Sequence, residues 1–205
     1  MSILSHITVD WRRYQIRNCS LPETIPCGWA GPHLWVPTEY FVMSWDWDLG
    51  HVAIGFEPGF FIDGASIPVI TGGIVDPIAA LPGSWPHDKG YTTCAGTRPY
   101  QVWTGTAEWE ERQLRDANTG LPIKWDGIYE PSEERRRARA DAVLMAFWLA
   151  SGMPRDMAER GYAAVRLAGS RAWESVETPD PVRPDIAARA RIQASAPAGL
   201  LAAAA

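Results

Sequence analysis

Residues 85–91 (WPHDKGY) place a histidine directly before an aspartate and a tyrosine four residues after the histidine. On a helix, His87 and Tyr91 would share one face, while Asp88 would project about 100° away and could meet a cation on a neighbouring loop. The proline before the histidine fits only the start of such a helix, and the glycine before the tyrosine weakens it. The His-Asp pair is therefore either a chemical site or a polar cap, and the motif alone leaves both alternatives open.

A second candidate is Asp141, in the segment RARAD of residues 137–141. Helical spacing puts Asp141 on one face with Arg137, Leu144 and Trp148, and a carboxylate on such a partly apolar stripe is costly unless it is paired. Arg137 would give a simple salt bridge. His87 is the alternative partner, because an aspartate that accepts a histidine N–H fixes the tautomer and raises the basicity of the ring.

A third polar position is Asp63, in the segment FIDGASIP of residues 61–68. It lies at a predicted strand end before a glycine-bearing turn, where Asp63 and Ser66 could simply make local turn hydrogen bonds. We expect Asp63, His87, Asp88 and Asp141 to lie near one another.

Four blocks of the chain together resemble domain-of-unknown-function family 1353, which is found in phages, prophages and bacterial genomes. They are FIDGASIP, HDKGY, RARAD and GYAAVRLAGSRAW, which occur in this order between residues 57 and 173. The family has no settled biochemical role, so the resemblance implies a phage-type gene but no particular reaction. It favours some role in a phage and does not choose between two functions. The first is a phage-type structural or accessory virion protein, located in the virion or the host cytoplasm, which binds other virion or phage proteins through its tryptophan-rich surface and its tail.

The HDxxY segment followed by a helix with an aspartate is also similar, more distantly, to phospholipase A2. That similarity implies that His87 is the general base for a water, that Asp88 is a Ca²⁺ ligand and that Asp141 orients the histidine. Tyr91 occupies the last position of the motif. The similarity also implies that the loop after Asp63 stands near the calcium, with Asp63 as a second metal ligand. The alternative function is thus a His/Asp-dependent hydrolase of lipid esters that Ca²⁺ could assist. Contact with lipid is expected only if the protein has this function. The sequence does not decide whether Ca²⁺ is the cofactor.

The strands and helices predicted around these residues indicate an α+β fold, with an N-terminal antiparallel β region packed on two C-terminal helices. Residues 40–47 and 51–57 predict a hairpin, residues 60–63 a short third strand, and residues 108–127 a peripheral hairpin. Residues 21–37 should be mostly loop, and residues 64–106 carry too many glycines and prolines for long regular elements.

The helices are predicted from their ends. One begins near Pro131-Ser132 and stops at Ser151-Gly152, and a second covers residues 155–167. We expect a single domain over residues 1–175, followed by a Pro/Ala-rich tail over residues 176–205 that is disordered or bound to a partner.

Composition narrows the classes of function. The 205-residue chain has a net charge of -5, which argues against nucleic-acid binding. No segment predicts a membrane span or a signal peptide, so we expect a soluble, non-secreted protein. The 11 tryptophans favour either a large aromatic core or a binding surface. Cys19, Cys27 and Cys94 form no ligand or disulfide pattern and are expected to be free thiols.

Overall fold

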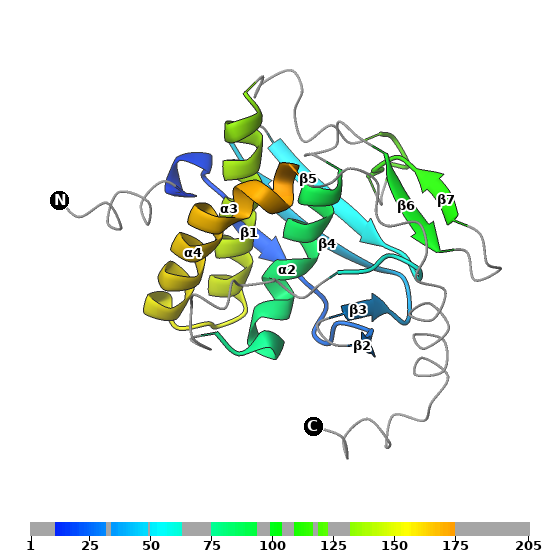
Figure 1. The fold of residues 1–205 in the computed structure, drawn as a ribbon, viewed down its shortest axis with the longest axis horizontal. Coiled ribbons are helices and arrows are strands. Elements are labelled where there is room, and N and C mark those ends of the chain that lie inside the picture. Colours follow the sequence, from blue (N-terminus) through cyan, green and yellow to red (C-terminus); the bar gives the residue numbers. More distant parts are fainter. Residues whose placement is uncertain are drawn as a thin grey trace, which may run out of the picture.

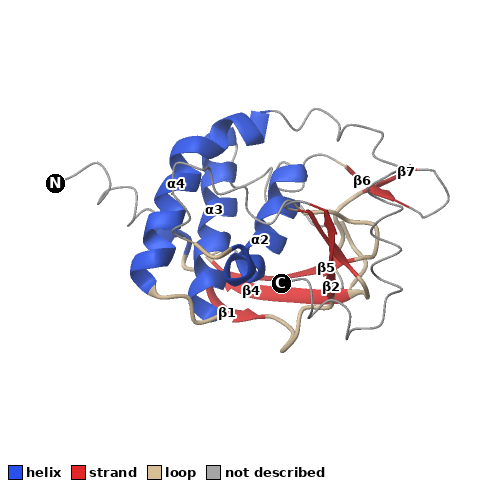
Figure 2. Ribbon diagram, turned by 60° about the horizontal axis from the view of Figure 1, so that its bottom comes forward, coloured by secondary structure: helices blue, strands red, loops and turns tan. Residues whose placement is uncertain are grey.

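The computed structural model has an α+β fold, as predicted, in which helices lie together against antiparallel strands (Figures 1 and 2). The structure describes residues 11–31, 34–48, 50–62, 75–93, 99–103, 109–116, 119–122 and 132–174. Residues 176–205, predicted to be a tail, lie outside these ranges, as does Cys94. Cys19 and Cys27 are free thiols. No helix in the described part of the chain is both long and apolar enough to cross a membrane.

The principal sheet has the strand order β1-β4-β5 and is antiparallel throughout. Its strands are β1 (Arg17–Ser20), β4 (Phe41–Trp47) and β5 (Gly50–Phe56). Alternate residues of β4 are buried, so that Phe41, Met43, Trp45 and Trp47 all enter the core. The predicted hairpin at residues 40–57 is confirmed, with a register that runs from Phe41 opposite Phe56 to Trp47 opposite Gly50.

The prediction of a loop over residues 21–37 is wrong. Here β2 (Cys27–Gly31) pairs with β3 (Leu34–Pro37) and places Trp29 opposite Trp35. Aromatic cross-strand pairs stabilise a short ribbon, and the proline stands at its end, where a missing N–H costs little. The predicted third strand at residues 60–63 is reduced to one antiparallel bridge between Ile62 and Trp35.

The peripheral hairpin is shifted from its predicted place. β7 (Trp109–Arg112) pairs with the upstream β6 (Tyr100–Trp103), and among the described residues of the predicted second strand Pro122 forms an isolated antiparallel bridge with Arg115.

The helix α2 (Pro77–Thr92) contradicts the prediction that residues 64–106 hold no long regular element. Asp76 caps it by accepting a hydrogen bond from the backbone N–H of Ile78 at 3.0 Å, and Pro77 occupies the first turn. Packing outweighs the cost of the two internal prolines, because the small residues of α2 let it approach the next helix closely. A Cβ on Gly83 would lie only 2.7 Å from the backbone oxygen of Leu144.

That next helix, α3 (Glu133–Ala150), is the central element of the fold, and the predicted ends are confirmed. It is buried from Arg137 to Trp148 and lies between α2, the sheet and α4 (Figure 1). Helix α4 (Arg155–Glu174) begins where predicted but continues past residue 167. The 3-10 turn η1 (Trp11–Tyr14) packs beside the first half of α3. The described residues thus form three α-helices, where the sequence predicted two.

Candidate functional site

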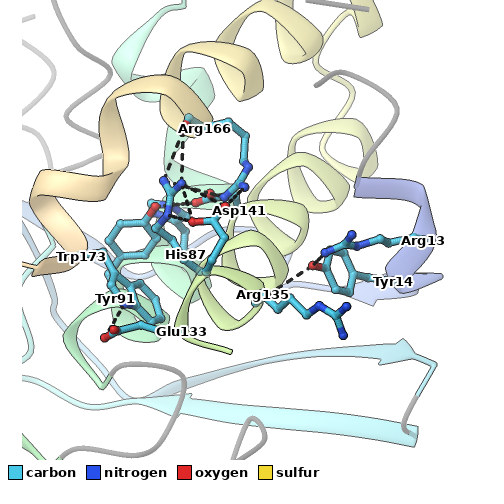
Figure 3. A network of polar contacts seen from close by, with 11 residues as sticks. Arg13, Tyr14, His87, Tyr91, Glu133, Arg135, Asp141, Arg166 and Trp173 are labelled. Carbon is cyan, nitrogen blue, oxygen red and sulfur yellow. Dashed lines mark hydrogen bonds and ion pairs between the residues drawn. The ribbon is translucent and has the colours of Figure 1, made fainter. Parts of the chain in front are cut away.

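The close packing of α2 on α3 brings His87 to Asp141. Nε2 of His87 donates a hydrogen bond to Oδ1 of Asp141 at 2.9 Å, and Nδ1 lies 2.9 Å from Oδ1 of Asp88 on its own helix. Tyr91 follows one helical turn later, with its ring centroid 4.2 Å from that of His87. Figure 3 shows His87, Asp141 and Tyr91 gathered between the helices.

Asp141 is the centre of the cluster, and its side chain is fully buried. Its Oδ1 accepts a second hydrogen bond, from the hydroxyl of Tyr91 at 2.7 Å. Its Oδ2 accepts a hydrogen bond from Arg166 of α4 at 2.8 Å, while Arg137, the partner expected from spacing, lies farther away at 3.9 Å. The buried carboxylate therefore has partners from all three helices, which offset the cost of its desolvation.

Helix α4 closes the cluster over Tyr91. The rings of Tyr91 and Trp173 meet edge to face at 5.0 Å. A Cβ on Gly169 would come within 2.6 Å of the Tyr91 hydroxyl, so glycine is what permits this approach. Arg166 also pairs with Glu134 of α3, which fixes the guanidinium above Asp141. The site is consequently a set of polar groups that hold one another between three helices.

The electrostatics of the cluster favour a charged histidine. Burial opposes charge on His87, but the hydrogen bonds and charges of Asp141 and Asp88 outweigh it and raise its pKa to about 9. Burial also acts against the Asp141 carboxylate, yet His87 and Arg166 together hold the pKa of Asp141 below its usual range. At neutral pH His87 is therefore an imidazolium that donates hydrogen bonds to two carboxylates.

Three of the four acidic and histidine residues predicted to converge do so, namely His87, Asp88 and Asp141, and Tyr91 joins them. Asp63 lies outside the described residues. Asp88 was expected to project away towards a cation on another loop, but its carboxylate turns back to the neighbouring imidazole, because the protonated ring offers it a charge-assisted hydrogen bond.

Arg166 is a member of the site that was not predicted from the sequence. Its position carries a signal, since Arg166 lies one turn after Tyr162 and next to Val165, two positions of the predicted helix that are buried in the structure. An arginine on such an apolar stripe needs a buried anion, just as Asp141 needs a buried cation. Glu134, which binds the same guanidinium, is exposed and gave no comparable signal.

Calcium does not fit the described residues of this site. Ca²⁺ takes six to eight oxygen ligands, usually including several carboxylates. Among the residues that the structure describes, no group of three or more His, Cys, Asp and Glu side chains could hold a metal ion. Asp88 is engaged by His87, and Asp141 is engaged by His87, Tyr91 and Arg166. We therefore derive no chemical step through calcium.

Fold and site together define an α+β protein with a buried Asp-His-Asp cluster between helices. Comparison with known proteins gives no match, whether to protein-family models, to curated proteins or to solved structures. The resemblances described under Sequence analysis remain predictions.

Proposed function

We propose that this protein is a hydrolase in which His87 acts as the general base. The observation that carries the proposal is the arrangement at Nε2 of His87, where Asp141 accepts the N–H and is itself held by Tyr91. An aspartate bound to one imidazole nitrogen fixes the tautomer, so that the other nitrogen carries the lone pair for catalysis. Here that other nitrogen is Nδ1, on the side of Asp88.

The two sides of the imidazole differ in access. The side chain of Asp141 is fully buried, whereas those of His87 and Asp88 are 8% and 14% exposed. The carboxylate next to Nδ1 is therefore less deeply buried than the carboxylate next to Nε2. General-base catalysis by histidine requires a lone pair on the second nitrogen, and Nδ1 can offer one only when its hydrogen bond to Asp88 opens.

In the proposed reaction, neutral His87 takes a proton from water at Nδ1 while the water oxygen forms a bond to the carbonyl carbon of an ester. The carbon–oxygen bond to the alcohol then breaks, and the leaving oxygen takes the proton back from Nδ1. Asp141 stabilises the imidazolium between these two proton transfers. Tyr91 keeps Asp141 in place and does not exchange a proton, because burial and the neighbouring Asp141 carboxylate raise its pKa.

Asp88 limits this reaction in the described conformation. Its carboxylate occupies Nδ1 and keeps the ring protonated, so the base forms only when that hydrogen bond opens or the pH rises towards 9. The proposal therefore includes a dependence of the rate on Asp88 and on pH.

Lipid and simple carboxylic esters are the proposed substrates, since the similarity of HDxxY to phospholipase A2 suggests this class. The resemblance to family 1353 would place the activity in a phage or prophage product. Binding to other virion proteins, the first function predicted from the sequence, has weaker support. The exposed large apolar side chains of the described residues lie on separate segments of the chain: Trp29, Tyr40, Ile78, Leu121 and Leu167.

The test is turnover of phospholipid vesicles and of a water-soluble ester by purified protein, with added Ca²⁺ and with a chelator. His87→Gln should lower the rate at least ~100-fold, the smallest usual contribution of a general base. His51→Gln is the matched control, since His51 also contacts an aspartate, Asp46 at 2.8 Å, but is exposed. This variant should keep full activity.

Folding of the variants is checked by thermal unfolding. If His87→Gln does not fold, Tyr91→Phe replaces it, because it keeps the ring and removes only the hydroxyl that holds Asp141. No turnover of either substrate by the wild type, or full activity in folded His87→Gln or in the Tyr91→Phe variant that replaces it, would overturn the proposal.

A further inference from the structure

A second cluster of polar side chains lies at the end of β5, apart from the His87 site. Lys89, two residues after His87 on α2, reaches this strand. Its ammonium donates hydrogen bonds to the backbone oxygen of Gly55 at 2.8 Å and to Oε2 of Glu57 at 3.0 Å. Lys89 is fully buried, and three aromatic rings surround its ammonium within cation–π range: Phe56, Phe60 and Tyr100. The lysine is therefore fixed in place, and it in turn fixes Glu57.

Glu57 links α2 to the β6–β7 ribbon. Its Oε1 accepts a hydrogen bond from the hydroxyl of Tyr100 at 2.6 Å, and a guanidinium nitrogen of Arg112 lies 3.8 Å from the same oxygen. Arg112 also donates two hydrogen bonds to Glu110, at 2.7 Å and 3.1 Å. These contacts join the end of β5 to the ribbon beside it (Figure 1), and both carboxylates have a positive partner.

Tyr40, the residue before β4, lies over Gly55. A Cβ on Gly55 would come within 2.7 Å of two carbons of the tyrosine ring, so the ring rests on bare backbone. Tyr40 is nevertheless 55% exposed. Burial and the charges of Glu57 and Asp116 raise the pKa of its hydroxyl, which therefore remains a hydrogen-bond donor. One part of the ring is thus supported by the strand, while the rest is accessible to a ligand.

A hollow of about 640 Å³ opens among these groups, which is within the usual range for small-molecule sites. Tyr40, Glu57 and Tyr100 line it, together with Arg112, Gln113 and other residues of β7 and the segment that follows. The amide of Gln113 can both donate and accept hydrogen bonds. A carboxylate has about four acceptor positions, so one that is already paired can also accept a hydrogen bond from a ligand. The hollow therefore offers donors and acceptors at several positions beside two tyrosines.

We infer that this hollow binds a neutral sugar. A pyranose presents C–H groups on one face, which pack on an aromatic ring, and hydroxyl groups at its rim, which both donate and accept hydrogen bonds. The ring of Tyr40 offers such a surface, and the polar lining offers partners for the hydroxyls. A charged ligand fits less well, because the carboxylates of Glu57 and Glu110 already have positive partners. The inference is independent of the proposed ester hydrolysis, since the described residues that line the hollow include none of the His87 cluster.

The test is titration of the purified protein with glucose, galactose, N-acetylglucosamine, maltose and diacetylchitobiose, followed by saturation-transfer NMR, which detects weak binding. At least one of these sugars should bind saturably. Tighter binding of a disaccharide would assign a glycan chain as the ligand, and equal binding a free sugar. Tyr40→Ala should weaken binding at least ~10-fold, because it removes the aromatic surface. Tyr40→Phe keeps the ring and should bind within about twofold of the wild type.

The matched control is Trp29→Ala, which removes another exposed aromatic side chain, 43% exposed, from the β2–β3 ribbon outside the hollow. It should bind like the wild type. If Tyr40→Ala does not fold, as judged by thermal unfolding, Glu110→Ala replaces it, since Glu110 lines the hollow and is exposed. Choline is titrated in parallel, because tyrosines also bind quaternary ammonium groups. Binding of choline without any sugar, no binding of any sugar, or a loss no larger in the hollow variant than in Trp29→Ala would overturn the proposal.

Discussion

Nε2 of His87 lies 2.9 Å from Oδ1 of Asp141, across the interface of two helices and 54 residues of chain. Both side chains are almost wholly inaccessible, and each carries the charge that the other needs. The same contact can hold α2 on α3 and can prepare Nδ1 for catalysis. The predictions below separate these two roles.

Replacing Asp141 should lower the stability of the folded protein. Asp141→Asn leaves His87 and Arg166 buried without their shared counter-charge, so we expect the free energy of unfolding to fall by about 3–5 kcal/mol. The measurement is equilibrium unfolding in urea. Asp156→Asn makes the same chemical change in an exposed ion pair with Arg160, and should cost less than about 1 kcal/mol. Similar losses in the two variants would show that the Asp141 contacts are not stabilising.

The raised pKa of His87 predicts that stability depends on pH. The folded protein binds this proton with a pKa of about 9, against 6.5 for an ordinary histidine. The contribution of protonated His87 to the free energy of unfolding is therefore fully present below pH 6.5 and is lost as the pH rises towards 9. Urea unfolding should show a decrease of at most ~1.4 kcal/mol per pH unit, the limit for one proton.

The contribution of His87 to the pH dependence of the free energy of unfolding is best measured between pH 6.5 and 8. Burial outweighs the charge of Glu57 and lowers the pKa of Lys89 to about 8, so above that pH Lys89 adds stability as the pH rises. His87→Gln should flatten the decrease between pH 6.5 and 8, whereas His51→Gln should leave it unchanged. An unchanged slope in His87→Gln would assign the dependence to other groups.

Local patterns explain which elements could be predicted from the sequence. The β4–β5 hairpin follows from alternating apolar residues around a turn, and the ends of α3 follow from Ser132 and Gly152, which has a φ of 89°. Helix α2 was missed because Pro82 and Pro86 argue locally against a helix. What stabilises it is tertiary, including the hydrogen bond from the indole N–H of Trp148 to the backbone oxygen of Ala80 at 2.9 Å.

The same division applies to the site. His87 and Asp141 could be predicted as site residues from the sequence. Asp141 lies on a partly apolar helix face, where a carboxylate needs a partner, and His87 lies in the HDxxY motif, where it could be that partner. The direction of the Asp88 carboxylate could not be predicted, since it depends on the charge of His87, which Asp141 sets from another helix. Arg166 is not marked by the apolar spacing that predicts α4, because what it supplies to the site is a buried charge.

The close approach of α2 to α3 should be sensitive to one methyl group. Gly83→Ala favours a helix by up to ~1 kcal/mol, but its Cβ would lie 2.7 Å from both the Leu144 oxygen and the Trp148 ring. We expect a net loss of about 1–3 kcal/mol in the free energy of unfolding, as in other overpacked cores. The variant should also weaken the His87–Asp141 contact, seen as a smaller dependence of stability on pH. A gain in stability would show that the helices can separate without cost.

Asp88 provides the sharpest test of the catalytic role. Asp88→Asn removes one of the two carboxylates that keep His87 protonated, so the pKa of His87 should fall and the neutral base should be more abundant at pH 7. We expect the rising limb of the pH–rate profile for ester hydrolysis to shift down by about one pH unit. The rate at pH 7 should therefore rise several-fold, with little change at alkaline pH.

A calcium ligand would behave in the opposite way. If Asp88 holds Ca²⁺ for the reaction, Asp88→Asn should lower the rate at every pH, and excess Ca²⁺ should restore part of it by mass action. Asp46→Asn serves as the control, because Asp46 also contacts a histidine, but at an exposed site of the β4–β5 hairpin. Its pH–rate profile should match the wild type. A profile that Asp88→Asn leaves unmoved, with or without Ca²⁺, would mean that Nδ1 of His87 takes no part in the rate-limiting proton transfer.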